Sequence, residues 1–439
     1  MNKGGNTVTR PFLGTGFFLL IFIISKTKGD KNMINKEELS ISTKDIKKKA
    51  KENLSYGKAI RNYLHTYPEQ SNKEFKTSSF LQNELKKMGY KIIKIPNKNS
   101  FLALLDSGKF GKTVGFRSDM DALKILEDSN NLSQKREVIS KNKGLMHACG
   151  HDGHMAIALT SAKILKDYKD ILKGKIYFIF EQAEETCEGV GDVISFIKDK
   201  NIIFDVIYGN HVDPSLDIGK FSIKDGIIQA GSMGFDVDIY GKGGHGSRPD
   251  LSKSPIQALV KIIDNLESLW LSEFDPRDNI SLSIGSINAG SAPNIIADKA
   301  NFKGTSRFIK DETGEKALDL FKNIVENTAK LYSSKVNFND YTKIVTYPTI
   351  NDEKLAKLSR NVANSLFENS IVDKKMSFGS ETFSAYSNIA PSIFVELGIK
   401  NKKYGSGSNI HTKNFDLDPN VIYYASSLLS TFAFEILTK

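Results

Sequence analysis

The residues best suited to chemistry lie together at positions 146–154, Met-His-Ala-Cys-Gly-His-Asp-Gly-His. This stretch holds three of the seven histidines and one of the two cysteines in the chain. Thiolate sulfur and imidazole nitrogen are the ligands that Zn²⁺ and similar divalent ions prefer. Because Cys149 and His151 are two residues apart, both can turn toward one ion. A buried loop with hydrogen-bonded histidines is the ordinary alternative, and the density of ligand residues favours a metal site over it.

The elements expected to position this stretch are a strand before it and a helix after it. Residues 113–117 have the composition of a strand, and apolar positions recur at helical spacing from Ile157 to Leu165. The stretch is therefore expected to run from a loop into a helix start. A helix start carries unpaired N–H groups and the positive end of the helix dipole, which favour a thiolate. We therefore expect Cys149 to be ionised.

Two groups of acidic residues also follow predicted strands. Glu184 and Glu185 come just after a predicted strand at residues 175–181. Adjacent carboxylates can divide their roles, one binding metal and the other accepting a proton from water. Asp119 and Asp121 follow the strand at residues 113–116. One of them is expected to orient a metal-binding histidine, because such a histidine typically donates its second N–H group to a carboxylate.

Residues 147–154 and 117–123 resemble signature motifs of the M20 metallopeptidase family. The resemblance is greatest to its amidohydrolase branch, which includes the hippurate, N-acyl-amino-acid and auxin-conjugate hydrolases. It extends over residues 57–430, with the motifs in the family's order. The other matching segments are residues 61–69, 181–185, 210–212, 241–250, 293–296, 304–307, 377–383 and 409–418.

The resemblance implies two divalent metal ions in each subunit, with Zn or Mn most expected and Co or Ni also compatible. The implied metal ligands are Cys149, His151, Glu185, His211 and His411. Cys149 stands where other M20 peptidases have a bridging Asp, and Glu184 is implied as the general base. The implied reaction is hydrolysis of the amide bond of a small N-acyl amino acid, which gives a carboxylic acid and an amino acid.

The resemblance also implies residues that contact the substrate. In the family, His245, Asn294 and Arg307 contact the substrate carboxylate or the oxyanion of the tetrahedral intermediate, often across a dimer. Arg suits this role because it pairs with a carboxylate through two parallel hydrogen bonds. We therefore expect a homodimer, with hinges near Asp225 and Phe338 that let an inserted domain close over the metals.

The chain departs from the family's motifs at a few positions. Thr382 replaces an Asp, so any role of that Asp is expected to be lost. Glu181 and Gln182 stand in place of Gln-Pro. Cys187 has no counterpart and is interpreted as a free thiol, whereas His65 is interpreted as a structural residue near the site.

Two alternatives to an N-acyl-amino-acid amidohydrolase remain. One is a dipeptidase or carboxypeptidase of the same family, which the Cys-containing motif argues against. The other is a non-catalytic metal-binding protein. The intact pair Glu184 and Glu185 argues against it, because a structural metal site has no use for a free base. A structural zinc site is also closed by four ligands, whereas five ligands on two ions leave positions open.

Helical and extended patterns alternate along the chain, which predicts an α/β fold with a mostly parallel central sheet. A chain of 439 residues also suggests two domains. We expect a catalytic metal-binding domain at residues 33–225 and 338–439. Residues 226–337 are expected to form a smaller inserted α+β lid or dimerisation domain, with the order strand, helix, strand, strand, helix. The strand at residues 235–240 alternates apolar and acidic residues, which predicts an exposed strand.

The composition limits the classes of partner and compartment. The net charge of +10 is spread as lysine runs, and no nucleic-acid-binding motif accompanies it, so we expect a solvated surface and no nucleic-acid partner. Two cysteines exclude a disulfide framework and suggest a reducing compartment.

Residues 1–32 have two interpretations. Basic residues flank an apolar run at positions 17–24, as in a signal peptide or membrane anchor, but no small-residue cleavage site follows. The slightly favoured alternative is that translation starts at Met33, which predicts a cytoplasmic protein.

Overall fold

The computed structural model describes the backbone of residues 36–438 and the side chains of residues 43–438. The expectations about residues 1–32 lie outside this range. The chain divides into two units, residues 1–41 and residues 42–439. All elements below lie in the second unit, except that α1 (Lys36–Glu52) begins in the first. No helix in the described range is both long and apolar enough to cross a membrane.

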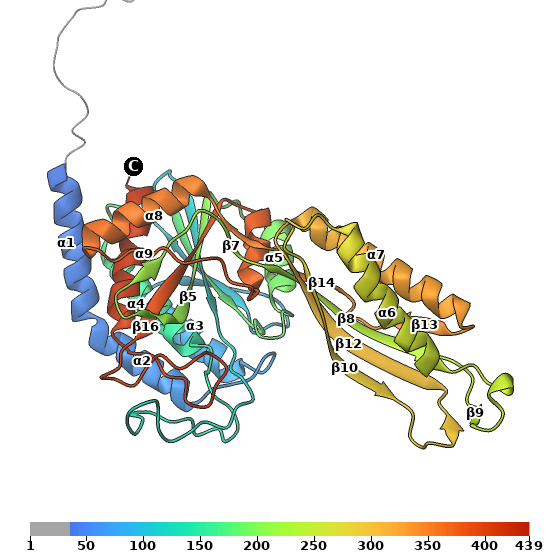
Figure 1. Cartoon of the computed structure of the whole chain (residues 1–439). Coiled ribbons are helices and arrows are strands. Elements are labelled where there is room, and N and C mark those ends of the chain that lie inside the picture. The colour runs from blue at the N-terminus through green and yellow to red at the C-terminus, as the bar shows by residue number, and fades with distance from the viewer. Residues whose placement is uncertain (1–35, 439) are drawn as a thin grey trace, which may run out of the picture. The chain divides into compact units, whose positions relative to one another are not determined.

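A seven-stranded sheet carries the predicted metal-binding motifs (Figure 1). In spatial order its strands are β1 (Lys91–Lys94), β2 (Phe101–Asp106), β4 (Lys175–Glu181), β3 (Thr113–Asp119), β5 (Val206–Asp217), β16 (Ser392–Lys400) and β6 (Phe221–Ser222). The four strands from β4 to β16 are parallel, and the strands outside them pair antiparallel. The α/β class with a mostly parallel central sheet is therefore confirmed.

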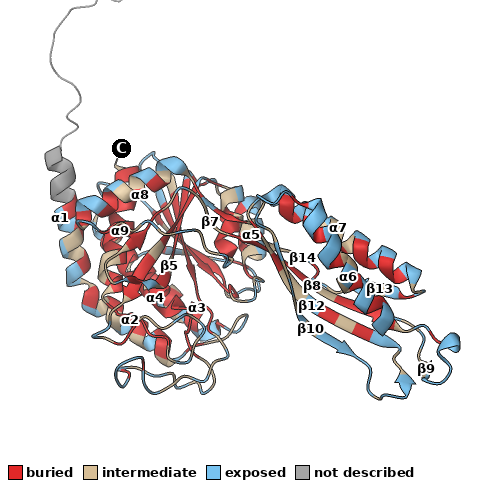
Figure 2. Cartoon of the chain, viewed as in Figure 1, coloured by how far each residue is buried: buried red, intermediate tan, exposed pale blue. Residues whose placement is uncertain are grey.

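Helices cover both faces of this sheet. On one face lie α2 (Leu54–Thr66), α3 (Phe75–Lys87), α4 (His151–Asp167), α8 (Glu353–Leu366) and α9 (Val421–Leu437). On the other face lie α5 (Val190–Asp199) and the 3-10 helix η2 (Thr382–Asn388). Helix α4 is buried along almost its whole length (Figure 2), as expected for a helix between a sheet and other helices. Its burial fixes the position of the helix start at His151.

A second, antiparallel sheet has its own apolar core. Its strands are β10 (Ser281–Ala289), β12 (Lys299–Phe308), β8 (Gly231–Tyr240) and β13 (Lys335–Phe338), in that order, with β14 (Lys343–Thr346) also paired to β8. Helices α6 (Pro255–Glu273) and α7 (Asp311–Leu331) pack on one face. This gives the predicted order of strand, helix, strand, strand, helix, and β14 extends the same sheet beyond residue 337.

The expectation that residues 235–240 form an exposed strand is wrong. Strand β8 lies between β12 on one side and β13 and β14 on the other, and most of it is buried. Its apolar side chains join the core under α6 and α7. Asp236 and Asp238 on the other face pair with Lys303 and Lys299, at 2.8 and 3.0 Å. The acidic residues therefore mark a face with basic neighbours, not an exposed strand.

Two small sheets complete the described part of the chain. One pairs β7 (Gly226–Gln229) with β15 (Thr349–Asn351). The other pairs β9 (Gly244–His245) with β11 (Ile295–Ile296), and the 3-10 helix η1 (Pro249–Leu251) follows β9. This second pair carries His245 and, next to it, Asn294.

Candidate active site

The predicted metal-binding loop turns sharply at Gly150, the residue before α4. Gly150 has a φ of +84°, a left-handed conformation that residues with a side chain rarely adopt. A Cβ atom there would also lie 2.5 Å from Cγ2 of Val212 on β5. Glycine at this position therefore permits the turn that places Cys149 and His151 on either side of the helix start.

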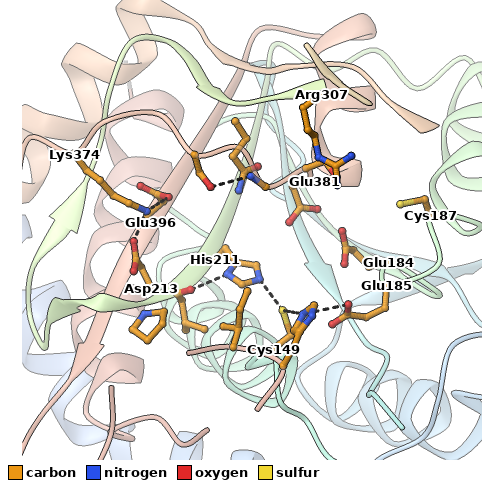
Figure 3. A pocket seen from close by; sticks show the side chains of 18 residues that line it. Cys149, Glu184, Glu185, Cys187, His211, Asp213, Arg307, Lys374, Glu381 and Glu396 are labelled. Atoms are coloured by element: carbon orange, nitrogen blue, oxygen red, sulfur yellow. Dashed lines mark hydrogen bonds and ion pairs between the residues drawn. The ribbon is translucent and has the colours of Figure 1, made fainter. Parts of the chain in front are cut away.

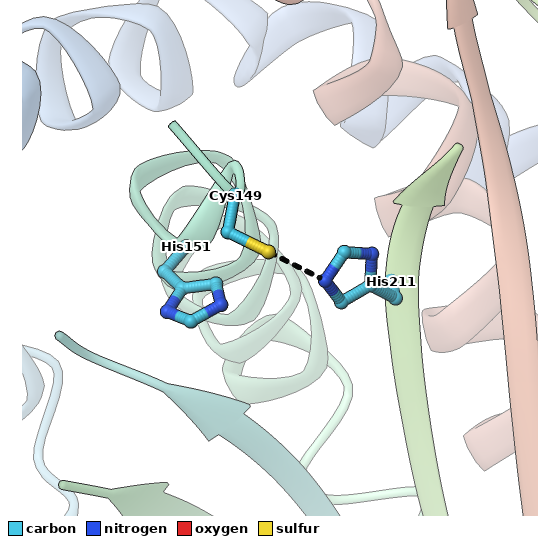
Figure 4. Close-up of side chains that lie close together, drawn as sticks. All are labelled: Cys149, His151 and His211. Atoms are coloured by element: carbon cyan, nitrogen blue, oxygen red, sulfur yellow. Dashed lines mark hydrogen bonds between the residues drawn. The ribbon is translucent and has the colours of Figure 1, made fainter. Parts of the chain in front are cut away.

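Donor atoms from four separate segments converge on this loop. Cys149, His151 and His211 offer donor atoms that lie within 4.8 Å of one another (Figure 4). Cys149, Glu185 and His411 form a second group of the same kind. The Sγ atom of Cys149 is 3.2 Å from Nε2 of His211 and 3.3 Å from Nε2 of His411. All five predicted ligands are therefore brought together, with Cys149 shared by the two groups.

The hydrogen bonds of two histidines leave Nε2 available as a ligand. Nδ1 of His151 donates to the backbone carbonyl of Asp121 at 2.9 Å, and Nδ1 of His211 donates to that of Val212 at 2.7 Å. Nε2 of His151 and Oε1 of Glu185 are buried, with no hydrogen-bond partner in the described part of the chain. Buried polar atoms are usually hydrogen-bonded, so these two atoms are suited to act as ligands of a divalent cation. The donor set fits two divalent ions.

Other groups around Cys149 oppose the ionisation that the helix start favours. Burial and the Glu185 carboxylate raise the pKa of the Cys149 thiol well above its usual value, against the lowering effect of His151. Loss of hydration in a buried site that also contains carboxylates disfavours the charged thiolate. A bound cation would favour the thiolate, because metal binding displaces the thiol proton.

Two other buried histidines, His154 and His65, have both ring nitrogens hydrogen-bonded to other residues. Nδ1 of His154 donates to Asp119 at 2.7 Å, and its Nε2 accepts from the Val212 backbone N–H at 3.0 Å. His65 contacts Asp152 and Glu127 through its two ring nitrogens, both at 2.8 Å. Both nitrogens of each ring are therefore engaged within the protein, although His154 also lies with Asp119 and His151 in a third group of possible ligands.

The two aspartates at the end of β3 have different neighbours. Oδ2 of Asp121 accepts from the backbone N–H of Glu185 at 3.1 Å, and its Oδ1 is 3.3 Å from Nδ1 of His151. Asp119 accepts from Arg117 at 2.8 Å and is 3.8 Å from Nε2 of His151. Asp121 therefore touches two of the proposed ligands, whereas Asp119 acts mainly on His154 and Arg117.

Glu184 follows a residue in an unusual conformation. Ala183 has a φ of +52°, and holding a non-glycine residue there costs about 1–3 kcal/mol. The buried Glu74 carboxylate accepts from the Ala183 backbone N–H at 2.8 Å and so stabilises this turn. Burial and the nearby Glu381 carboxylate raise the pKa of Glu184 well above its usual value. A carboxylate of raised pKa can accept a proton from water and return it later.

A buried arginine organises the carboxylates behind Glu184. Arg117 donates to Glu181 at 3.0 Å and to Thr382 Oγ1 at 2.7 Å, and lies 3.1 Å from Glu381. Thr382 in turn donates to Glu181 at 2.6 Å. The family motif has an Asp where this chain has Thr382. The Glu181 carboxylate lies beside Thr382 and can take the place of that Asp as a partner of Arg117.

A cavity of about 390 Å³ opens above the proposed ligands (Figure 3). Arg307 lines it beside Glu381, and its Nε donates to the Phe378 carbonyl at 3.2 Å. His245 and Asn294 do not line this cavity. They lie together at the pair of β9 and β11, where Gly246 N–H donates to the Asn294 carbonyl at 2.8 Å. The structure thus brings Arg307 to the metal-binding residues but leaves the other two predicted substrate contacts apart.

Several lining or supporting residues were given no role from the sequence, although Arg117 and Glu381 lie in the matching motifs. They are Glu74, Arg117, Asp213, Lys374, Glu381 and Glu396. Strand β5 continues beyond His211 to Asp217. Side chains alternate along a strand, so the continuation puts Asp213 on the same face as His211. In the sequence, the spacing of two residues between His211 and Asp213 was the only indication that Asp213 shares the face of His211.

The fold and this convergence of ligand residues define a metal-dependent hydrolase. The chain belongs to the peptidase family M20/M25/M40, whose model matches residues 115–435. This confirms the resemblance to the M20 family.

Known relatives extend the match over most of the chain. Thermostable carboxypeptidase 1 of Saccharolobus solfataricus is 33% identical, over 83% of this chain and 91% of that protein. N-acetyl-L-cysteine deacetylase of Bacillus subtilis is 32% identical, over 86% of this chain and 87% of that protein. A solved dinuclear metal-binding M20 peptidase from Bacillus subtilis is 27% identical, with a TM-score of 0.73, over 88% of this chain and 99% of that structure.

Proposed function

We propose that the protein hydrolyses the amide bond of N-acyl amino acids and releases a carboxylic acid and an amino acid. The observation that carries this proposal is the pair of ligand groups sharing Cys149, with Glu184 beside them. Two divalent ions would be held by Cys149, His151, Glu185, His211 and His411. When bound, such ions polarise a carbonyl and lower the pKa of water.

The chain's own residues would then move the proton and hold the substrate. Glu184 accepts a proton from the attacking water, whose oxygen bonds to the amide carbon. Glu184 gives the same proton to the amide nitrogen as the carbon–nitrogen bond breaks, so the amino acid leaves as an amine. Arg307, in the cavity wall, pairs with the carboxylate of that amino acid.

The test is a panel of N-acyl amino acids assayed with the purified protein after loading with Zn²⁺, Mn²⁺ or Co²⁺. We expect release of free amino acid with at least one ion, and its loss after chelation. A protein that holds both ions yet cleaves no member of the panel would contradict the proposal.

A carboxypeptidase is the second candidate, and the likeness to the Saccharolobus solfataricus enzyme favours it. The last residue of a peptide presents the same free carboxylate next to a cleavable amide, so one site can hold both kinds of substrate. The comparison that separates them is kcat/KM for N-acyl amino acids against peptides of two to four residues with the same last residue. A higher value for the longer peptides would favour the carboxypeptidase.

A further inference from the structure

Three charged side chains form one wall of the cavity, and the proposed reaction does not use them. Lys374 Nζ lies 2.5 Å from Oδ2 of Asp213 and 2.6 Å from Oε1 of Glu396. All three residues line the cavity that contains the proposed metal ligands. In the view of Figure 3 they lie on one side of His211, with Arg307 on the other. We call these three residues the charged wall.

The strand register places the charged wall beside the metal-binding residues. Glu396 on β16 is the direct partner of His211 on β5 in a parallel pair of strands. Partnered residues in neighbouring strands project to the same face, about 4.8 Å apart. Asp213, two residues beyond His211, projects to that face as well. A substrate held at the metal-binding residues therefore comes within reach of the charged wall.

The two carboxylates of the charged wall differ in how many hydrogen bonds they accept. Asp213 accepts from the backbone N–H and the hydroxyl of Ser215, at 2.7 and 2.6 Å, and from Lys374. Glu396 accepts only from Lys374, on Oε1, among the hydrogen bonds of the described residues. Its second oxygen, Oε2, has no donor among the described residues and is not one of the buried atoms without a partner, so it is open to the cavity that Glu396 lines. A bound substrate can supply that donor.

The charge and the surroundings limit what the substrate can place there. Within the charged wall itself, two carboxylates and one ammonium leave one unit of negative charge, which disfavours an anionic group next to Glu396. The aliphatic side chains that line the cavity are those of Val212, Pro214 and Ile410. An apolar acyl group would remove water from the charges without replacing its hydrogen bonds. An ammonium or another hydrogen-bond donor satisfies both the charge and the open acceptor.

We infer that the charged wall selects substrates whose acyl part carries an amino group. The inference rests on the proposed function, with Arg307 holding the carboxylate of the amino acid and the acyl part pointing to Glu396. Aminoacyl groups, which make the substrate a dipeptide, and longer amino-bearing acyl groups belong to this class of substrate, whereas simple aryl and alkyl acyl groups do not. The inference therefore favours the dipeptidase alternative over an enzyme for simple N-acyl amino acids.

The test compares substrates that differ only at the end of the acyl chain. β-Alanyl, butanoyl and succinyl derivatives of one amino acid form one set, and 4-aminobutanoyl, pentanoyl and glutaryl derivatives form a second. We expect the amino-ended member to have a kcat/KM about tenfold or more above the methyl-ended member in at least one set, since a site built for a donor rejects analogues that lack it. Preference for the methyl-ended or carboxylate-ended members in both sets would overturn the inference.

A variant then assigns the preference to Glu396. Glu396→Gln keeps the size of the side chain and removes its charge, so the ratio between amino-ended and methyl-ended substrates should fall toward one. Glu368→Gln makes the same change at an exposed position outside the cavity and should leave the ratio unchanged. An unchanged ratio in Glu396→Gln would overturn the inference. The comparison in the wild-type protein needs no variant, so it decides the matter even if Glu396→Gln does not fold.

The outcome also separates this inference from the proposed function. Hydrolysis of N-acetyl and butanoyl substrates without a preference for amino groups would leave the amidohydrolase proposal standing and remove only the inference. Failure to hydrolyse any N-acyl amino acid would remove both.

Discussion

At the scale of single residues, Glu184 is the proposed proton acceptor and Glu185, next to it, is a proposed ligand. Glu184→Gln keeps the size and hydrogen bonding of the side chain but cannot accept the proton. We expect kcat to fall about 10²-fold or more, with metal content unchanged by elemental analysis. Glu185→Gln is the matched control and should lower metal content as well. Unaltered turnover in Glu184→Gln would place the base elsewhere.

Cys149 offers a second test, because its thiol must lose a proton when a cation binds. Cys149→Ser should lower metal occupancy and activity together, since a hydroxyl is a far poorer ligand than a thiolate. Addition of Zn²⁺ to the metal-free wild-type protein in weak buffer should release a proton that the variant does not release. Full metal content in Cys149→Ser would show that the sulfur is not a ligand.

The pair Glu181 and Thr382 tests whether a carboxylate is needed beside Arg117. Glu181→Gln removes one of the carboxylates that hold the buried guanidinium, and we expect the free energy of unfolding to fall by about 1–3 kcal/mol. Thr382→Asp alone would add a buried negative charge. The double variant Glu181→Gln/Thr382→Asp keeps the charge constant and should recover most of the stability in urea unfolding. Additive losses in the double variant would contradict this account.

At the scale of elements, the local features of the site were predictable from the sequence. The helix start at His151 and the clustering of Cys149 with His151 depend on neighbouring residues and on the glycine between them. The length of β5 was not predictable, because it is set by pairing with β16, which lies far away in the sequence. The burial of β8 was missed for the same reason, since β12, β13 and β14 are what cover its edges.

The charged wall shows a further limit of prediction from sequence. Lys374 lies in a segment without regular structure, between residues that bridge to β6 and β7. No periodic pattern marks such a residue, and only the folded chain brings it to Asp213 and Glu396. Residues that act through partners on distant strands are in general the ones that local patterns do not reveal.

Helices α2 and α4 are joined through a buried ionic network that should depend on pH. Burial and Arg61 act to lower the pKa of His65, but the hydrogen bonds to Asp152 and Glu127 outweigh them and raise it above its usual value. The stability that His65 contributes is therefore fully present below about pH 6.5, its ordinary pKa, and is lost as pH rises through the raised value.

The corresponding variant is His65→Gln. We expect it to be less stable than the wild type by about 1–3 kcal/mol near pH 6 in urea unfolding, with the difference shrinking as the pH rises toward 9. His245→Gln is the control, because His245 is exposed, and its stability should follow the wild type throughout. A difference that grows with pH would show that His65 is neutral in the folded protein.

At the scale of the whole molecule, His245 does not line the cavity, so it would need either closure or a second subunit to contact a substrate there. Ser247 N–H donates to Nδ1 of His245 at 3.2 Å, so Nε2 carries the proton and is a hydrogen-bond donor. If Nε2 of His245 donates to the oxyanion of the tetrahedral intermediate, His245→Ala should lower kcat about 10²–10³-fold with a smaller change in KM. Kinetics within a few-fold of wild type would show that it only fills the turn.

Mixing two inactive proteins identifies which subunit supplies His245. In a dimer formed from His245→Ala and Glu184→Gln subunits, one site regains both residues if the histidine comes from the partner. Random mixing should then restore on the order of a quarter of wild-type activity. No recovery, with subunit exchange demonstrated by native mass spectrometry, would place His245 in its own chain's site or outside catalysis.

The sharing of Cys149 by two ligand groups has a consequence for how the protein acquires its metals. Because one sulfur atom belongs to both groups, the first ion to bind would deprotonate and orient a ligand of the second. Loading should therefore be cooperative, and by linkage the loss of either ion weakens the hold on the other. Oxidation of the Cys149 sulfur would also remove a ligand from both metal-binding positions at once, so a single modification would release both ions.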